Sequence, residues 1–241
     1  MSEQGSLLSL AHHMLDEEFL GQIESKGAYQ VVTLAPWQMW LARRNPLYAD
    51  SIRHCDATTI DGRWLSAILK LAGRQHDVLT GREIVEAVFQ RHVQGRIAVV
   101  GSSVQSHERL SVLRPNWLCI GGSFGTEVDL EKLEEVTKRI TEYGASVVFV
   151  ALGSPKQEAW GRYLADRANV TVIGIGGAIE TVVGLRKPPS KGIQRVGAEW
   201  LQRTIQDPVR FLPRIVQALS VMPRLVLEAL TIRRSANTTE F

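Results

Sequence analysis

Residues Val147 to Trp160 read VVFVALGSPKQEAW, and this stretch decides the fold that the sequence predicts. The run from Val147 to Ala151 is apolar without alternation, which is typical of a strand buried on both faces of a parallel sheet. Gly153 and Ser154 then break the strand, and Pro155 suits the first turn of a following helix. A buried strand, a small polar turn and a helix in direct succession indicate an α/β fold.

The polar end of this stretch is a candidate ligand site. In open α/β sheets, ligands bind beyond the carboxyl ends of the strands, where Lys156, Gln157 and Glu158 would lie. The small residues before them let backbone N–H groups approach a ligand, so residues 154–157 could form an anion-receptive helix N-terminus. The alternative is an ordinary strand-to-helix turn with solvated polar residues, and the pattern alone leaves it open.

The same alternation of strand and helix extends through most of the chain. Apolar strands are expected at 29–34, 56–60, 96–101, 117–122 and 170–177, and helices at 15–23, 64–71, 84–93 and 129–143. The glycines at 174, 176 and 177 do not form a dinucleotide fingerprint, because Ile179 stands where the next glycine would be needed, and a P-loop motif is absent from the sequence. We predict an α/β fold for residues 1–191, with a mainly parallel, Rossmann-like sheet flanked by helices.

Residues 192–241 have a different character and are predicted to form a basic, amphipathic helical appendage. Between positions 194 and 234 there are seven arginines and three acidic residues, a net charge of +4, interleaved with leucines and valines. Pro208, Pro213 and Pro223 are expected to divide the segment into short helices. It could pack on the core as a helix pair, or lie on a membrane surface with its arginines against anionic headgroups, which we favour. In the second case, deleting the residues after about Val221 should leave the core folded.

Composition excludes several classes of protein. The chain has 241 residues, 44% of them hydrophobic, and a net charge of only +3, which does not support nucleic-acid binding. Cys55 and Cys119 are isolated, and no histidine has metal-ligand spacing, so we predict no metal and a reduced, cytoplasmic environment. No signal peptide is evident. The longest membrane-span candidate, residues 170–185, contains Glu180, so the protein is expected to be soluble or peripheral.

Three motifs carry a resemblance to a known family. The pattern G-S-P-K-Q-E-x-W at 153–160, Ile-Gly-Gly-Ala at 175–178 and Gly-Ala-Glu-Trp-Leu-Gln-Arg at 197–203 resemble the bacterial WecG/TagA/CpsF family of N-acetylmannosaminyltransferases. The resemblance runs from about Val31 to about Arg214, in family order. It implies a glycosyltransferase without a cofactor, acting in cell-surface or exopolysaccharide biosynthesis. The implied donor is a UDP-sugar carrying N-acetylmannosamine, its uronate or glucose. The acceptor is a polyprenyl-diphosphate-linked saccharide at the cytoplasmic membrane face.

The resemblance also implies which residues bind the nucleotide-sugar. These substrate-binding candidates are Thr80, Gly101, Gly153, Pro155, Lys156, Gln157, Glu158, Gly176 and Gly177. For two of them the residues suggest a simpler role. Thr80 and Glu83 have the spacing of a capping box for the next helix, and Gly101 could belong to a plain turn.

Four further residues are candidates for the chemistry. Asp61 ends a predicted strand, and an inverting transfer needs one carboxylate that takes the proton of the acceptor hydroxyl; the alternative is a helix N-cap. Thr33, also at a strand end, could bond a phosphate or ribose or cap a helix. Arg203 and Arg210 match the family's E-W-x-x-R and P-x-R positions, and the resemblance implies that they neutralise the diphosphate of donor or acceptor.

This chain departs from the family pattern at two places. Ala35 replaces an asparagine, and residues 179–181 replace a phenylalanine and an aspartate. These changes keep a rival hypothesis open, namely a non-catalytic component of a polysaccharide-assembly complex that binds a nucleotide-sugar or lipid. Homo-oligomer formation is also left open by the sequence.

Overall fold

The structure is a computed structural model that describes residues 6–15, 17–91, 95–125, 129–190, 192–193 and 199–238. Its centre is a six-stranded sheet in the order β2-β1-β6-β5-β3-β4, and every pair of neighbouring strands is parallel. The predicted α/β fold with a parallel sheet is therefore confirmed. The strands are β1 Tyr29–Leu34, β2 Ala57–Ile60, β3 Arg96–Gly101, β4 Leu118–Ile120, β5 Ala145–Ala151 and β6 Thr171–Gly174.

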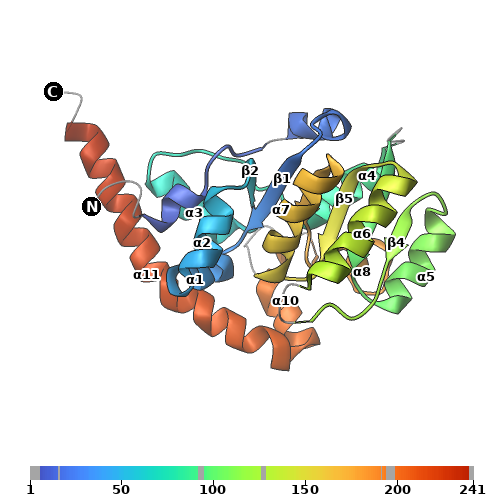
Figure 1. The fold of residues 1–241 in the computed structure, drawn as a ribbon. Coiled ribbons are helices and arrows are strands. Elements are labelled where there is room, and N and C mark those ends of the chain that lie inside the picture. Colours follow the sequence, from blue (N-terminus) through green and yellow to red (C-terminus); the bar gives the residue numbers. More distant parts are fainter. Residues whose placement is uncertain are drawn as a thin grey trace.

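Helices cover both faces of this sheet (Figure 1). Alternate residues of β5 separate the two sides: Val147 and Phe149 pack with α4, α5 and α8, whereas Val148 and Val150 pack with α6 and α7. All four side chains are fully buried, as the unalternating apolar run predicts. The bounds are α1 Pro36–Arg44, α2 Pro46–Arg53, α3 Arg63–Leu71, α4 Gly81–Gln90, α5 Val104–Leu113, α6 Leu130–Tyr143, α7 Lys156–Ala168, α8 Ala178–Val182, α10 Glu199–Gln206 and α11 Pro208–Thr238.

The N-terminal segment forms 3-10 turns. They are η2 Leu7–Leu10, η3 Glu17–Gly21 and η4 Ile23–Ser25. The single helix that we expected over residues 15–23 is thus wrong, and Gly21, a poor helix former, ends the second turn.

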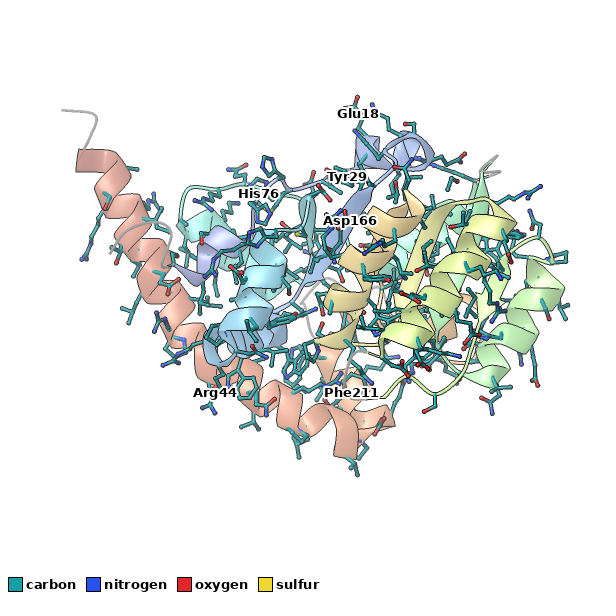
Figure 2. The ribbon with its side chains drawn as sticks, in the orientation of Figure 1. Glu18, Tyr29, Arg44, His76, Asp166 and Phe211 are labelled. Atoms are coloured by element: carbon teal, nitrogen blue, oxygen red, sulfur yellow. The ribbon has the colours of Figure 1, made fainter. Side chains whose placement is uncertain are left out.

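The strand order indicates where a ligand crevice is expected, beyond the carboxyl ends of β3 and β5. The connection after β3 runs outward to β4, while the connection after β5 runs in the opposite direction to β6. Where such connections diverge, the carboxyl ends of the two strands leave a crevice between their loops. Figure 2 shows Phe211, near the start of α11, at the opposite side of the molecule from Tyr29, which begins β1. The start of α11 therefore lies toward the carboxyl edge.

The C-terminal arm, which we define as α10 and α11, differs from its prediction. Pro213 and Pro223 do not end helices; α11 continues through both as one helix of 31 residues, and only the step from Gln206 to Pro208 interrupts the arm. Each internal proline removes one backbone hydrogen bond, but packing of the helix can offset this loss. Val221, Leu225 and Ala229 are fully buried in the same cluster as α1, α2 and α3.

A buried carboxylate fastens α11 to the N-terminus. Glu228 is 4% exposed, and its Oε2 accepts hydrogen bonds from the Ser6 hydroxyl and the Leu7 N–H, both at 2.8 Å. Its Oε1 accepts from Arg224 at 2.9 Å. The second half of α11 is thus packed into the core, and the expectation that residues after about Val221 can be removed harmlessly is not supported by this packing.

Among the described residues, one helix is long and apolar enough to cross a membrane by length and composition, Phe211–Ala236. This differs from our expectation that residues 170–185 would be the best candidate. Because Val221, Leu225 and Glu228 pack into the core, this half of the helix is engaged with the protein itself.

Candidate active site

Asp61 lies directly at the carboxyl end of β2. Its backbone N–H donates to the carbonyl of Leu34, the last residue of β1, at 2.7 Å, so the ends of these two strands are side by side. The N-cap residue of α3 is Gly62, whose φ of 108° favours glycine. Asp61 is therefore not the N-cap residue, and its half-buried side chain lies at the edge where ligands bind in such sheets.

Thr33 joins two strand ends. Its hydroxyl donates to the carbonyl of Gly174 at 2.8 Å, and its side chain is buried. The hydroxyl proton is thus used inside the protein, and only the oxygen's acceptor capacity is left for a ligand. Gln38 bonds the Ala35 N–H at 2.9 Å and the Thr33 carbonyl at 2.8 Å, so the backbone around Ala35 is satisfied without an asparagine.

The turn between β5 and α7 is open on one side. Gly153 has a φ of +75°, and a Cβ at this position would meet nothing within 4 Å. Pro155 is the N-cap residue of α7, so it lies directly before the first helical turn rather than within it. Lys156 donates from Nζ to the carbonyl of Phe124 at 2.9 Å, which ties the loop after β4 to this turn.

Gln157 and Glu158 point into the protein. Gln157 is 3% exposed; its Oε1 accepts from the Gly176 N–H at 3.1 Å, and its Nε2 donates to Glu158 Oε1 at 3.3 Å. Glu158 is 1% exposed and also accepts from the hydroxyls of Tyr48, at 3.2 Å, and Ser154, at 2.6 Å. The alternative of solvated polar residues is therefore wrong for these two.

Tyr48 is a residue of this cluster that the sequence reasoning missed. It is buried on α2 and lies 110 positions from Glu158. Burial raises the pKa of the Glu158 carboxyl, and burial likewise raises the pKa of the Tyr48 phenol far above its usual range. No short motif marks Tyr48, because its partner is distant in the sequence.

The turn after β6 is the second open glycine turn. Gly176 has a φ of +52°, and a Cβ there would meet nothing within 4 Å. A Cβ on Gly177 would lie 3.4 Å from the guanidinium of Arg186, which forms an ion pair with Glu180 at 2.7 Å. The two glycine turns, at Gly153 and Gly176, follow adjacent strands, since β5 pairs with β6.

Two further substrate-binding candidates, Thr80 and Gly101, lie at positions that pack against the residues before these turns. Thr80 and Glu83 form the predicted capping box of α4, which is confirmed. A Cβ on Gly81 would lie 3.2 Å from the backbone of Ile175. Gly101 has a φ of +86° and packs against Leu152, whose side chain would be 2.6 Å from a Cβ there. Neither Gly81 nor Gly101 therefore has room for a larger residue.

The arm reaches this edge through α10. The rings of Trp200 and Trp64 meet edge to face at 6.5 Å between centroids, and Trp64 follows Asp61 by three positions. Gln202 donates to the carbonyls of Lys187 and Pro188 at 3.3 and 3.4 Å. Arg203 lies on α10 and Arg210 on α11, but their side chains are outside the described part of the structure.

The described residues contain no group of three or more His, Cys, Asp or Glu side chains that could hold a metal ion. What they do provide at the carboxyl edge is the carboxylate of Asp61, two open glycine turns and the helix that carries Arg203.

Comparison with known proteins gives a family match over nearly the whole chain. Residues 6–236 match the family described as "Glycosyl transferase WecG/TagA/CpsF family". A Bacillus spizizenii relative is 28% identical over 229 residues, which cover 88% of this chain and 85% of the relative. A relative from Staphylococcus aureus strain MW2 is 35% identical over 81 residues, covering 33% of this chain and only 32% of that protein. Both are named N-acetylglucosaminyldiphosphoundecaprenol N-acetyl-beta-D-mannosaminyltransferase.

Proposed function

Because the chain belongs to the WecG/TagA/CpsF family of glycosyltransferases, we propose that it transfers N-acetylmannosamine from a UDP-sugar to an N-acetylglucosaminyl-diphosphate-polyprenol, with inversion. The names of the two relatives support this donor and acceptor. The uronate of N-acetylmannosamine and glucose are the competing donors. The family match disfavours the non-catalytic alternative.

The observation that carries the proposal is the gathering of site residues from distant parts of the chain. Asp61, Thr33, Gly153 and Gly176 follow or end four different strands, and all four strands finish at one edge of the sheet. This is where open α/β sheets bind their ligands.

Asp61 is the proposed general base. The acceptor hydroxyl attacks the anomeric carbon of the donor from the face opposite the leaving group, and Asp61 takes the hydroxyl proton as the new glycosidic bond forms. The bond from the anomeric carbon to the UDP oxygen breaks, and UDP leaves with the electron pair. One carboxylate is enough for this single displacement.

The glycine turns and the arm are the proposed binding elements for the charged part of the donor. At Gly153 and Gly176 the open side lets a diphosphate approach backbone N–H groups closely. Arg203, on the helix that contacts Trp64 beside Asp61, would neutralise the charge that develops on the leaving diphosphate, with Arg210 next to it on the arm. Thr33 can accept a hydrogen bond from a ligand hydroxyl.

We further propose that the arm places the enzyme on the inner face of the cell membrane. Its outward side is apolar; the exposed apolar side chains are Trp200, Leu201, Ile205, Val209, Leu212, Val216, Leu219, Leu227 and Leu230. Arginines interleave with them along the arm. An apolar stripe flanked by cations suits an anionic membrane surface, where the lipid-linked acceptor resides.

The deciding experiment measures UDP release with a panel of UDP-sugars and a short polyprenyl-diphosphate N-acetylglucosamine. Release that depends on acceptor, and is fastest with UDP-N-acetylmannosamine, supports the proposal. Faster release with the uronate or with glucose would reassign the donor. If the protein binds UDP-sugars without acceptor but releases UDP from none of them, the proposed activity is contradicted.

A further inference from the structure

Glu158 is a buried carboxyl whose hydrogen-bond donors are all neutral. Its Oε1 receives three donors: the Ser154 hydroxyl, the Tyr48 hydroxyl and the Gln157 amide. Its Oε2 is buried and has no hydrogen-bond partner in the described part of the chain. The ionised form of Glu158 would place negative charge on a buried oxygen without a hydrogen bond, which costs free energy. The protonated form carries no charge and avoids this cost.

Glu228 offers a comparison within the same molecule. It is also buried, but both of its oxygens accept hydrogen bonds, and one of its donors is the guanidinium of Arg224. Donors of that kind compensate the burial of a carboxylate. Glu158 lacks such a donor among its hydrogen bonds, so the two buried glutamates are built for different protonation states.

The partners of Glu158 lead directly to the two open glycine turns. Ser154 follows Gly153 in the β5–α7 turn, and Gln157 uses its other end to hold the N–H of Gly176. Tyr48 links the cluster to α2, and the backbone carbonyl of Glu158 accepts from the Gln30 amide on β1 at 2.7 Å. The Glu158 side chain thereby connects both turns to α2, and its backbone carbonyl is bonded to the sheet.

We propose that Glu158 is a positioning residue: as a neutral carboxylic acid, it holds the Gly153 and Gly176 turns at the spacing that the nucleotide-sugar requires, without touching the ligand. This inference rests on the proposed function, because the turns matter for transfer only if the donor binds between them. It assigns Glu158 and Tyr48 to the support of the site rather than to its surface.

The surrounding groups agree with a neutral acid. Burial raises the pKa of Glu158. The titratable groups near it are Tyr48, on α2, and Cys55, which follows α2; burial is the largest cause that raises the pKa of each, for Cys55 to about 12. Ser154 and Gln157 do not titrate. Tyr48 and Cys55 therefore add no charge beside Glu158 near neutral pH.

The kinetic test compares Glu158→Gln with Glu158→Ala. Glutamine keeps a neutral oxygen that can accept the three hydrogen bonds, so kcat/KM for the donor should stay within about threefold of the wild type. Alanine and, more weakly, Tyr48→Phe should raise the donor KM by roughly tenfold with a smaller change in kcat. If Glu158→Gln loses as much activity as Glu158→Ala, the charged carboxylate is needed and the proposal is overturned.

A second measurement needs no substrate and separates this inference from the proposed function. A carboxyl whose folded pKa is raised stabilises the fold fully below its unfolded value, about 4.3, and this contribution is lost as pH rises through the folded pKa. The Tm of the wild type minus that of Glu158→Gln should therefore fall with increasing pH above about 4.3. A difference that is flat or rises with pH would overturn the neutral-acid assignment, whether or not any sugar is transferred.

Discussion

The β5–α7 turn and the C-terminal arm differ in which side chains they bury and which they expose. Directly after the turn, at the start of α7, the polar side chains of Gln157 and Glu158 are 3% and 1% exposed. In the arm, the apolar side chains of Ile205 and Val209 are 75% and 87% exposed. The difference shows that burial follows available partners: Gln157 and Glu158 find donors and acceptors within the chain, whereas Ile205 and Val209 are not covered by the described part of the chain.

The largest effect is expected at Asp61, which belongs to neither region: it follows β2, and β1 and β6 separate β2 from β5 in the sheet. We expect Asp61→Asn to lower turnover by about two or more orders of magnitude, since asparagine cannot accept the acceptor's proton. Its free energy of unfolding should change little. Steady-state UDP release and thermal unfolding check both points, with Asp77→Asn at an exposed loop position as the control. Near wild-type turnover of Asp61→Asn would show that Asp61 is not the general base.

Leu225 and Leu227 divide the arm itself into an inward and an outward face. They are 0% and 65% exposed on the same helix. Leu225→Ala should lower the free energy of unfolding by about 2–5 kcal/mol through loss of buried contacts, and Leu227→Ala by about 0.5 kcal/mol or less. Denaturant unfolding of the two variants measures this. Equal effects would mean that α11 is not part of the core.

Gln157 tests whether the turn's inward polar groups serve donor binding. Gln157→Ala frees the Gly176 N–H and removes one donor to Glu158, so UDP-sugar binding should weaken by about 1–3 kcal/mol. Calorimetric titration with the UDP-sugar gives this value. Gln75→Ala, at an exposed position, should bind as the wild type does. Unchanged binding and kinetics for Gln157→Ala would move the donor site elsewhere.

The smallest effects are expected on the outward face of the arm. Val209→Ser combined with Val216→Ser should weaken binding to anionic vesicles by roughly tenfold, because each valine contributes about 0.7 kcal/mol when partly buried in the interface. Flotation with vesicles containing anionic lipid measures the change. Val112→Ser, an equally exposed valine on α5, is the control. A changed oligomeric state with unchanged vesicle binding would instead indicate self-association through this face.

Structural features that depend on residues close together in the sequence could be predicted from the sequence alone. The buried strand β5 and the capping box of Thr80 and Glu83 are of this kind, since the relevant residues lie within a few positions. The continuity of α11 through Pro213 and Pro223 could not, because the packing that offsets the lost hydrogen bonds comes from the N-terminal third of the chain. Tyr48 was missed for the same reason, as its partner Glu158 is 110 positions away.

The hydrogen bond from Ser6 to Glu228 spans 222 positions, and it sets the order in which the chain can fold during synthesis. The N-terminal turn η2 and the cluster around α1, α2 and α3 lack their last partners until Val221, Leu225 and Glu228 leave the ribosome. The parallel sheet, complete by Gly174, can form earlier. At translation rates of about 5–20 residues per second, that interval lasts a few seconds or more. The cluster around α1, α2 and α3 therefore gains its last partners only after Glu228 has been synthesised, later than the strands of the sheet.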